Sequence, residues 1–282
     1  MISGRTRSAG VIGSPVKHSL SPAIFNAAFS AAGLDWAYLA FEVPEGATGL
    51  ALGGVRALGI EGLSVTMPHK AAVLAGLDHV SPDVEALGAC NCITNLGGEL
   101  YGDSYDGAGL LGSLVDEGFE VDGARVGIVG AGGAGRSVAR AVGGAGAAAV
   151  LIVNRSAERA ARAAALAGPA GRVAAPEELA DVDLILNATP LGMGVVVTTD
   201  GAPEPLPVDV DRLGIGQLVV DLVYHPAVTP LLAAVRERGI AGVNGVGMLV
   251  HQAAHAFRRW TGEDPPLEAM SAAVVVGLAH KD

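Results

Sequence analysis

A glycine-rich segment at residues 130–135 constrains the fold of this chain more than any other feature. It reads Gly-Ala-Gly-Gly-Ala-Gly, and it lies between the apolar run 125–129 and an alanine-rich stretch of helical period. The pattern G-x-G-x-x-G between a strand and a helix is typical of dinucleotide-binding folds. The sequence therefore predicts a nucleotide-binding α/β unit in the middle of the chain.

The glycines of this segment have distinct expected roles. Gly130 makes the tight turn, Gly132 lets the backbone approach a pyrophosphate, and Gly135 allows the helix to pack closely. The free N–H groups of the first helical turn then bind the phosphates. A glycine-rich turn without any ligand is the alternative. The cofactor-binding residues expected here are Gly130, Ala131, Gly132, Gly133 and Ala134.

The rest of the chain repeats the alternation of short apolar runs and helical segments. This pattern predicts βαβ units, parallel sheets and an α/β fold class, and 282 residues suit about two domains. The expected strands are 10–13, 36–43, 60–65, 125–129, 149–153, 183–186 and 217–220, with a hairpin at 93–101 around Gly97 and Gly98. The expected helices include one with Ser21 at its N-cap and Gly33 as its stop, 246–260, and one from Leu267; residues 194–213 are expected to form a loop.

The composition disfavours several classes of partner and site. A net charge of −11 disfavours nucleic acid and anionic membrane surfaces. No uncharged apolar run approaches the roughly 18 to 20 residues that a membrane span requires. Cys90 and Cys92 are the only cysteines, too few for a disulfide framework or for a metal site without distant ligands. We therefore expect a cytoplasmic protein with no metal site, no nucleic-acid partner and no membrane segment.

One lysine, Lys70, lies where a reaction can use it. The run 60–65 reads as a buried strand, and Pro68 marks its end because proline cannot join a central ladder and fits the first turn of a helix. Lys70 and Thr66 are therefore expected just beyond the carboxyl end of a strand, where open α/β sheets bind ligands. An ammonium there can hydrogen-bond a developing alkoxide and give it a proton. A surface lysine on a loop is the alternative.

The residues after the strand 149–153 indicate which dinucleotide fits. NAD-selective folds place an Asp or Glu there to hold the ribose 2′-hydroxyl. This chain instead has Asn154, Arg155 and Ser156, with Arg159 one turn later. Guanidinium groups can clamp a 2′-phosphate, and no carboxylate is present to repel it. The sequence therefore favours NADP. The alternative for Arg159 is an ordinary solvent-exposed helix residue with no role in binding.

Eight segments together resemble the shikimate dehydrogenase family over nearly the whole chain. In order and spacing this set is highly specific. The segments are 18–22 (HSLSP), 64–70 (SVTMPHK), 88–91 (GACN), 130–136 (GAGGAGR), 154–156 (NRS), 187–193 (NATPLGM), 221–226 (DLVYHP) and 245–254 (GVGMLVHQAA).

This resemblance implies both an activity and a domain organisation. The activity is the reversible NADPH-dependent reduction of 3-dehydroshikimate to shikimate in aromatic amino-acid biosynthesis, by a monomer or homodimer. The organisation is a substrate-binding domain of residues 1–107 and 245–282, completed by the C-terminal helices. A Rossmann-type NADP-binding domain of residues 108–244 is inserted into it.

The resemblance also implies roles for single residues. Lys70 and Asp106 match the catalytic pair, with Asp106 keeping the ammonium oriented and charged; capping of a helix is the alternative for Asp106. Ser19 and Ser21 bind the substrate carboxylate, with Tyr224 close by. The residues implied to hold the ring hydroxyls are Thr66, Asn91, Asp106 and Gln252, and Lys70 also contacts the substrate. The implied cofactor residues beyond the glycine segment are Asn154, Arg155, Ser156, Arg159, Thr189, Leu222 and Gly245.

Two departures from the family pattern bear on the substrate. Ser104 and Tyr105 stand where the family usually has Asn-Thr before the aspartate, and Cys92 stands where it usually has threonine. Tyr105 either reshapes the pocket or packs behind it. Two other functions therefore stay open: a paralogue acting on quinate or another ring hydroxy acid, and a nucleotide-binding regulator that has lost catalysis. Retention of Lys70 and Asp106 argues against the regulator.

Overall fold

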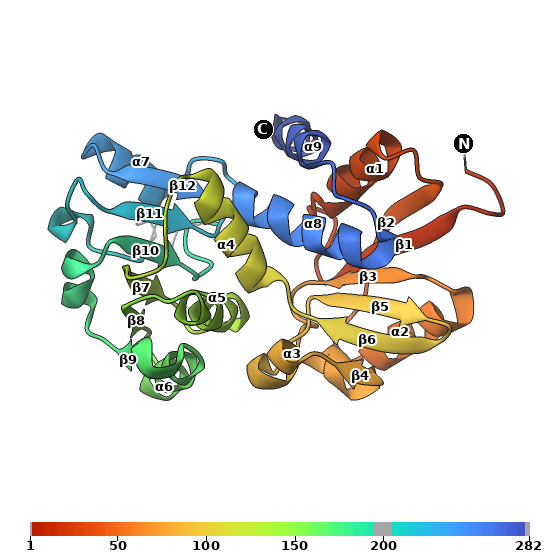
Figure 1. The fold of residues 1–282 in the computed structure, drawn as a ribbon, viewed down its shortest axis with the longest axis horizontal. Helices are drawn as coiled ribbons and strands as arrows, with labels where there is room; N and C mark the ends of the chain where they lie inside the picture. The colour runs from red at the N-terminus through yellow and green to blue at the C-terminus, as the bar shows by residue number, and fades with distance from the viewer. Residues whose placement is uncertain (1, 194–204, 280–282) are drawn as a thin grey trace, which may run out of the picture. The chain divides into compact units, whose positions relative to one another are not determined.

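The computed structural model describes residues 2–193 and 205–279, which form two compact units. One unit comprises Met1–Gly109 and Val250–Asp282, and the other comprises Leu110–Leu249. Both divisions fall inside helices, α4 (Asp106–Asp116) and α8 (Val246–Thr261) (Figure 1). Each of these two helices therefore contributes residues to both units.

The first unit is built on a mixed six-stranded sheet with the order β2-β1-β3-β5-β6-β4. Strand β1 (Arg7–Gly13), next to one edge, pairs in parallel with β2 (Trp36–Glu42) and with β3 (Gly62–Val65). The predicted hairpin is confirmed, because β5 (Cys92–Leu96) and β6 (Glu99–Asp103) pair antiparallel around Gly97 and Gly98, which both have positive φ. The short strand β4 (His79–Val80) lies parallel to β6.

Helices cover both faces of this sheet. On one face, Leu52 and Val55 of α2 (Thr48–Leu58) share a buried cluster with Leu63 of β3. On the other face, α1 (Ser21–Ala31) packs beside α9 (Leu267–Ala279), and the rings of Phe25 and Tyr38 stack 4.4 Å apart. A side chain at Gly62 would overlap the indole ring of Trp260, so α8 packs directly on the backbone of β3.

The second unit is a doubly wound parallel sheet, which confirms the predicted fold class. Its strand order is β12-β11-β10-β7-β8-β9, and these neighbouring strands all pair in parallel. The order reverses between β7 and β10, the switch point at which Rossmann-type sheets bind dinucleotides. The strands are β7 (Arg125–Val129), β8 (Ala149–Val153), β9 (Gly171–Val173), β10 (Leu184–Asn187), β11 (Leu218–Asp221) and β12 (Ala241–Asn244).

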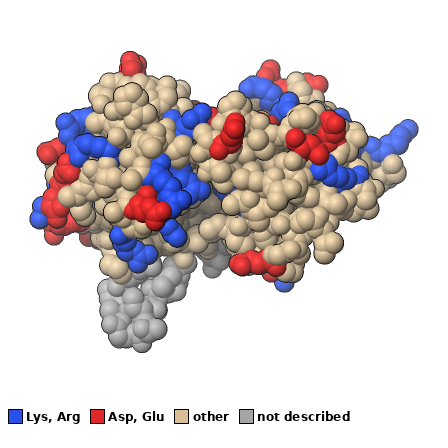
Figure 2. All heavy atoms as spheres, turned by 90° about the horizontal axis from the view of Figure 1, so that it is seen from below, with Lys and Arg blue, Asp and Glu red and all other residues tan. Residues whose placement is uncertain are grey.

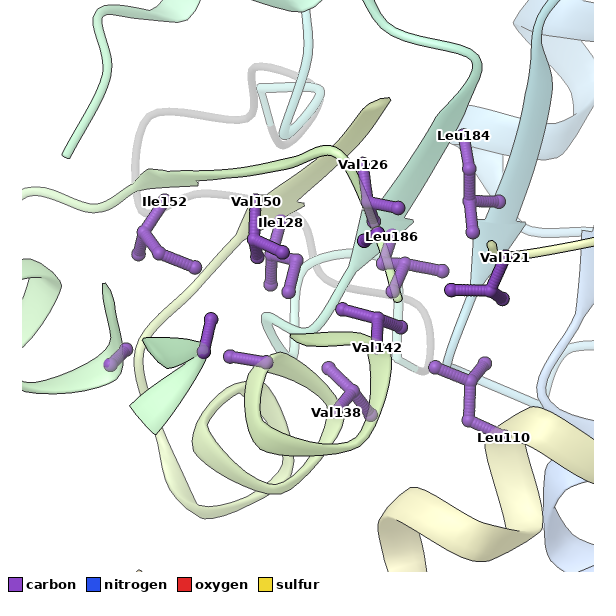
Figure 3. Close-up of a cluster of buried hydrophobic side chains, with 14 of the residues drawn as sticks. Leu110, Val121, Val126, Ile128, Val138, Val142, Val150, Ile152, Leu184 and Leu186 are labelled. Atoms are coloured by element: carbon purple, nitrogen blue, oxygen red, sulfur yellow. The ribbon is translucent and has the colours of Figure 1, made fainter. Parts of the chain in front are cut away.

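Two helices, α5 (Gly133–Gly144) and α6 (Ala157–Leu166), cover one face of this sheet. Figure 3 shows Val138 and Val142 of α5 directed toward the strands, where Ile128 and Leu186 are also fully buried. Each such valine contributes on the order of 1.5 to 3 kcal/mol by burial. The opposite face is covered by a second cluster, which includes residues of α7 (Pro230–Glu237). The remaining helices are α3 (Pro82–Leu87) and the 3₁₀ turns Ala72–Gly76, Gly168–Ala170, Pro176–Asp181 and Val210–Arg212.

Two local predictions were wrong. Ser21 is the first residue of α1 and not its N-cap, which is Leu20; the hydroxyl of Ser19 instead accepts the N–H of Ser21. Pro68 does not begin a helix, because residues 67–70 form a turn that precedes the 3₁₀ segment Ala72–Gly76. Of the predicted loop at 194–213, residues 194–204 lie outside the described residues, and residues 205–213 contain neither an α-helix nor a strand, only the short 3₁₀ turn Val210–Arg212, as expected of a loop.

The surface charge is mixed on the face drawn in Figure 2, where acidic and basic side chains are interspersed and neither forms a continuous band. In the described part of the chain, no helix is both long enough and apolar enough to cross a membrane.

Candidate active site

Lys70 and Asp106 form an ion pair in the first unit. Lys70 lies in the turn after β3, and Asp106 is the first residue of α4, three residues after β6. Lys70 Nζ lies 2.6 Å from Asp106 Oδ2. The lysine side chain is 24% exposed and the aspartate side chain only 6%. A charge-assisted hydrogen bond of this length to a nearly buried carboxylate holds the ammonium in one orientation.

Asn91 fixes the second oxygen of the same carboxylate. Its Nδ2 donates to Asp106 Oδ1 at 2.7 Å and lies 3.2 Å from Gln252 Oε1 on α8. Its own Oδ1 accepts the backbone N–H of Tyr105 at 2.9 Å, which sets the orientation of the amide. Among residues 2–193 and 205–279, Asp106 is the only side chain that the Lys70 ammonium bonds, so two of its three N–H groups are left for a ligand.

Six of the seven predicted substrate residues of the first unit fall into two hydrogen-bonded groups, and Thr66 belongs to neither. Hydrogen bonds bring Lys70, Asn91, Asp106 and Gln252 together. Ser19 and Ser21 contact each other, with their hydroxyls 3.2 Å apart. Thr66 lies directly after β3, where its backbone N–H donates to Ile12 of β1 at 3.0 Å.

Two tyrosines were singled out from the sequence, one in each unit. Tyr224 belongs to the second unit, and burial raises the pKa of its phenol. The ring of Tyr105 stacks on His255 of α8 with centroids 5.5 Å apart, and burial raises the pKa of its phenol as well. The backbone N–H of Tyr105 contacts the cluster, through Asn91.

The glycine segment of the second unit contains two different kinds of glycine. Gly130 has φ +105°, and a Cβ there would lie 2.9 Å from the carbonyl oxygen of Ala188. A Cβ at Gly135 would overlap the carbonyl oxygen of Gly130. Cβ atoms at Gly132 and Gly133 would meet no heavy atom within 4 Å. The fold therefore requires Gly130 and Gly135, while Gly132 and Gly133 leave open space at the N-terminus of α5.

The residues after β8 join this segment to α6. The backbone N–H of Ala131 donates to Asn154 Oδ1 at 3.2 Å, and Asn154 Nδ2 donates to the carbonyl of Ser156 at 3.0 Å. Ser156 caps α6 by accepting the N–H of Arg159. Arg155 and Arg159 are exposed, and within the described residues neither guanidinium forms an ion pair. Two exposed guanidinium groups thus lie after the second strand of the sheet.

The remaining predicted cofactor residues, Thr189, Leu222 and Gly245, follow the ends of β10, β11 and β12. The hydroxyl of Thr189 donates to Asn187 Oδ1 at 2.7 Å. A Cβ at Gly245 would overlap the carbonyl oxygen of Leu222, so only glycine lets these two segments approach each other.

Sequence reasoning missed a buried polar network at this edge of the sheet, formed by Asn187, Asp221 and Thr229, each 0% exposed. A polar residue at the end of each of two apolar runs, at 187 and 221, was the available signal. Among the described residues, no group of three or more His, Cys, Asp or Glu side chains could hold a metal ion.

Known proteins resemble this chain along nearly its whole length. Three family models match: the shikimate dehydrogenase substrate binding domain at residues 11–93, shikimate / quinate 5-dehydrogenase at 113–209, and the shikimate 5'-dehydrogenase C-terminal domain at 245–275. A shikimate dehydrogenase (NADP(+)) of Symbiobacterium thermophilum is 44% identical over 287 residues, covering 98% of this chain and 96% of the relative.

Solved structures agree with these sequence matches. A shikimate dehydrogenase in complex with NADP⁺ has a TM-score of 0.91 at 35% identity, covering 99% of this chain and 98% of that one. The shikimate dehydrogenase of Thermus thermophilus, in complex with NADP(H) and shikimate, has a TM-score of 0.87 at 34% identity, covering 96% and 100%.

Proposed function

This chain belongs to the shikimate dehydrogenase family, and we propose that it catalyses the reversible NADPH-dependent reduction of 3-dehydroshikimate to shikimate. The observation that carries this proposal is the ion pair of Lys70 and Asp106, 2.6 Å long, with Asn91 on the second carboxylate oxygen. A regulator without catalysis has no need of an ammonium that is held by a nearly buried carboxylate and has two N–H groups left for a ligand. The aromatic amino-acid pathway and the cytoplasm are the setting we propose, with the chain acting as a monomer or homodimer.

Lys70 acts as the proton donor in the proposed reaction. When bound, NADPH supplies a hydride to the ketone carbon of the substrate. Negative charge then grows on the ketone oxygen, where the Lys70 ammonium donates a hydrogen bond and then its proton. Asp106 holds the ammonium in place for this transfer. The side chain of Lys70 is 24% exposed, so water can return the proton.

The remaining substrate residues orient the ring. We propose that the hydroxyls of Ser19 and Ser21 turn from each other to donate to the substrate carboxylate, with Tyr224 completing this end. The ring hydroxyls are then held by Thr66, Asn91, Asp106 and Gln252. In this arrangement the substrate-binding domain is residues 1–107 and 245–282, and the cofactor-binding domain is residues 108–244.

The residues of the second unit fit NADP. Open space at Gly132 and Gly133 beside the first turn of α5 suits a pyrophosphate, which the free N–H groups of that turn can bind. Asn154 accepts a hydrogen bond from the backbone of the glycine segment at Ala131, and Arg155 and Arg159 supply positive charge for a 2′-phosphate. Thr189, Leu222 and Gly245 line the other half of the sheet edge in this proposal.

Replacing Arg155 by alanine is expected to weaken NADP binding about ten- to a hundred-fold, because one charge-assisted hydrogen bond contributes about 1.5 to 3 kcal/mol. The Michaelis constant for NAD should change little, since NAD lacks the 2′-phosphate. Arg162 on the following helix α6 is a matched control, because it is exposed and paired with Glu158, and Arg162→Ala should leave the Michaelis constants for NADP and NAD unchanged. Steady-state kinetics with shikimate and each cofactor measures this. Equal use of both cofactors by the unaltered protein would contradict the assignment of NADP.

A further inference from the structure

Asp221 is a buried carboxylate without a cationic partner. It ends β11, is 0% exposed, and forms no ion pair with any of the described residues. Its Oδ1 accepts Asn187 Nδ2 at 2.9 Å and the backbone N–H of Val223 at 3.2 Å, and its Oδ2 accepts the hydroxyl of Thr229 at 2.6 Å. Burial raises the pKa of this carboxyl, and the three donors oppose that shift. Because a buried charge costs stability, its position calls for a reason beyond packing.

The network fixes the direction of every hydrogen bond that leads to Thr189. Since Asn187 donates its Nδ2 to Asp221, its Oδ1 must face the other way. That oxygen accepts both the backbone N–H of Thr189, at 3.1 Å, and its hydroxyl, at 2.7 Å. The hydroxyl proton of Thr189 is therefore already donated to Asn187. One lone pair of the Thr189 hydroxyl oxygen accepts the backbone N–H of Leu191 at 3.3 Å. A hydroxyl has two lone pairs, so Thr189 presents one acceptor and no donor to a ligand.

The strand order indicates which half of a dinucleotide meets Thr189. The sheet order reverses between β7 and β10, with the Asn154 side of the sheet beyond β7 and the Thr189 side beyond β10. In a sheet of this order, the two mononucleotides of the ligand lie on opposite sides of the reversal. Given that Asn154 and Arg155 hold the adenosine half, Thr189 lies on the nicotinamide side.

We propose that Asp221 is a positioning residue for the nicotinamide nucleoside: through Asn187 it holds the hydroxyl of Thr189 as an acceptor for a hydroxyl or amide donor of that nucleoside. This inference rests on the proposed function, because it takes NADP as the ligand. Asp221 itself touches no ligand in this arrangement. The acceptor oxygen Oδ1 of Asp221 stabilises one of the two orientations that the Asn187 amide could adopt, and the other orientation would direct an amide nitrogen at Thr189.

The test compares dissociation constants for NADP and for 2′,5′-ADP, which lacks the nicotinamide nucleoside. Asp221→Ala and Thr189→Val should each weaken NADP binding about tenfold, the loss of one hydrogen bond, and leave 2′,5′-ADP binding unchanged. The double variant should lose no more than either single variant, because both act through one hydrogen bond. Asp221→Asn should retain most of the affinity, since its amide oxygen can still accept from Asn187.

A matched control separates this role from general stability. Val219→Ala on the same strand creates a buried cavity, and it should lower the melting temperature without changing either dissociation constant. If Asp221→Ala does not fold, Thr189→Val and Asp221→Asn still decide the question. Unchanged NADP binding by Thr189→Val, or equal losses for NADP and 2′,5′-ADP in either Asp221 variant, would overturn the inference while the proposed function stands. Failure of the unaltered protein to bind NADP would overturn both.

Discussion

Lys70→Ala is expected to lower kcat by about a hundred- to ten-thousand-fold, the range typical of a lost general acid. The dissociation constant for shikimate should change far less, because the ammonium acts chiefly on charge that appears in the transition state. Single-turnover kinetics together with a binding titration separates the two effects. Lys17 is a suitable control, since its side chain is 90% exposed and its ammonium lies 4.0 Å from the carboxylate of Glu42. Lys17→Ala should leave both constants unchanged.

Variants of Asp106 and Ser19 test the same assignment of roles. Asp106→Asn should also slow turnover, and it should weaken substrate binding because Asp106 is proposed to contact a ring hydroxyl. The double variant with Lys70→Ala should lose less than the product of the two single losses, since the residues act as a pair. Ser19→Ala should act mainly on KM. If Lys70→Ala kept near-normal turnover while Ser19→Ala abolished it, the assigned roles would be wrong.

Gly135→Ala is expected to abolish NADP binding and to destabilise the second unit. The added methyl group would overlap the carbonyl oxygen of Gly130, which is backbone and cannot turn aside. Overpacking of this kind costs about 1 to 3 kcal/mol or more. Gly132→Ala meets no heavy atom within 4 Å, so it should fold normally and weaken NADP binding only by blocking the ligand. Thermal melts and NADP titrations of both variants measure these effects.

Gly144 at the end of α5 is the matched control for these glycines. A Cβ there meets nothing within 4 Å, so Gly144→Ala should raise the melting temperature slightly and leave NADP binding unchanged. Wild-type NADP affinity in Gly135→Ala would show that the close approach of α5 to the glycine turn is not needed for binding. Wild-type affinity in Gly132→Ala would remove this position from the proposed pyrophosphate site.

The sequence predicted best those strands whose signal is local. The runs 125–129 and 149–153 match β7 and β8 residue for residue, because a parallel strand covered on both faces is a continuous apolar run. Edge strands lack that signal. β9 (Gly171–Val173) and β12 (Ala241–Asn244) have no buried residue, and neither was predicted. Their position depends on pairing with β8 and β11, which a local pattern cannot show.

The candidate site shows the same difference between features with a local sequence signal and features that depend on contacts distant in sequence. The glycine segment was readable because its spacing is set by one turn and one helix. The turn at Pro68 could not be predicted in this way, because it depends on a contact distant in sequence: the carbonyl of Met67 accepts a hydrogen bond from the backbone N–H of Ser14 on the neighbouring loop. The network of Asn187, Asp221 and Thr229 exists because β10 and β11 are neighbours, and their separation in sequence hides that contact.

The central claim is tested most directly by following NADPH formation by absorbance, with shikimate and quinate assayed side by side and each paired with NADP and with NAD. We expect rapid, concentration-dependent turnover with shikimate and NADP, and much slower turnover with the other three pairs. Faster turnover with quinate and NAD would make the chain a quinate dehydrogenase on the same fold. Absence of turnover with all four pairs, from folded protein that binds NADP, would contradict the assignment of Lys70 and Asp106 as a working catalytic pair.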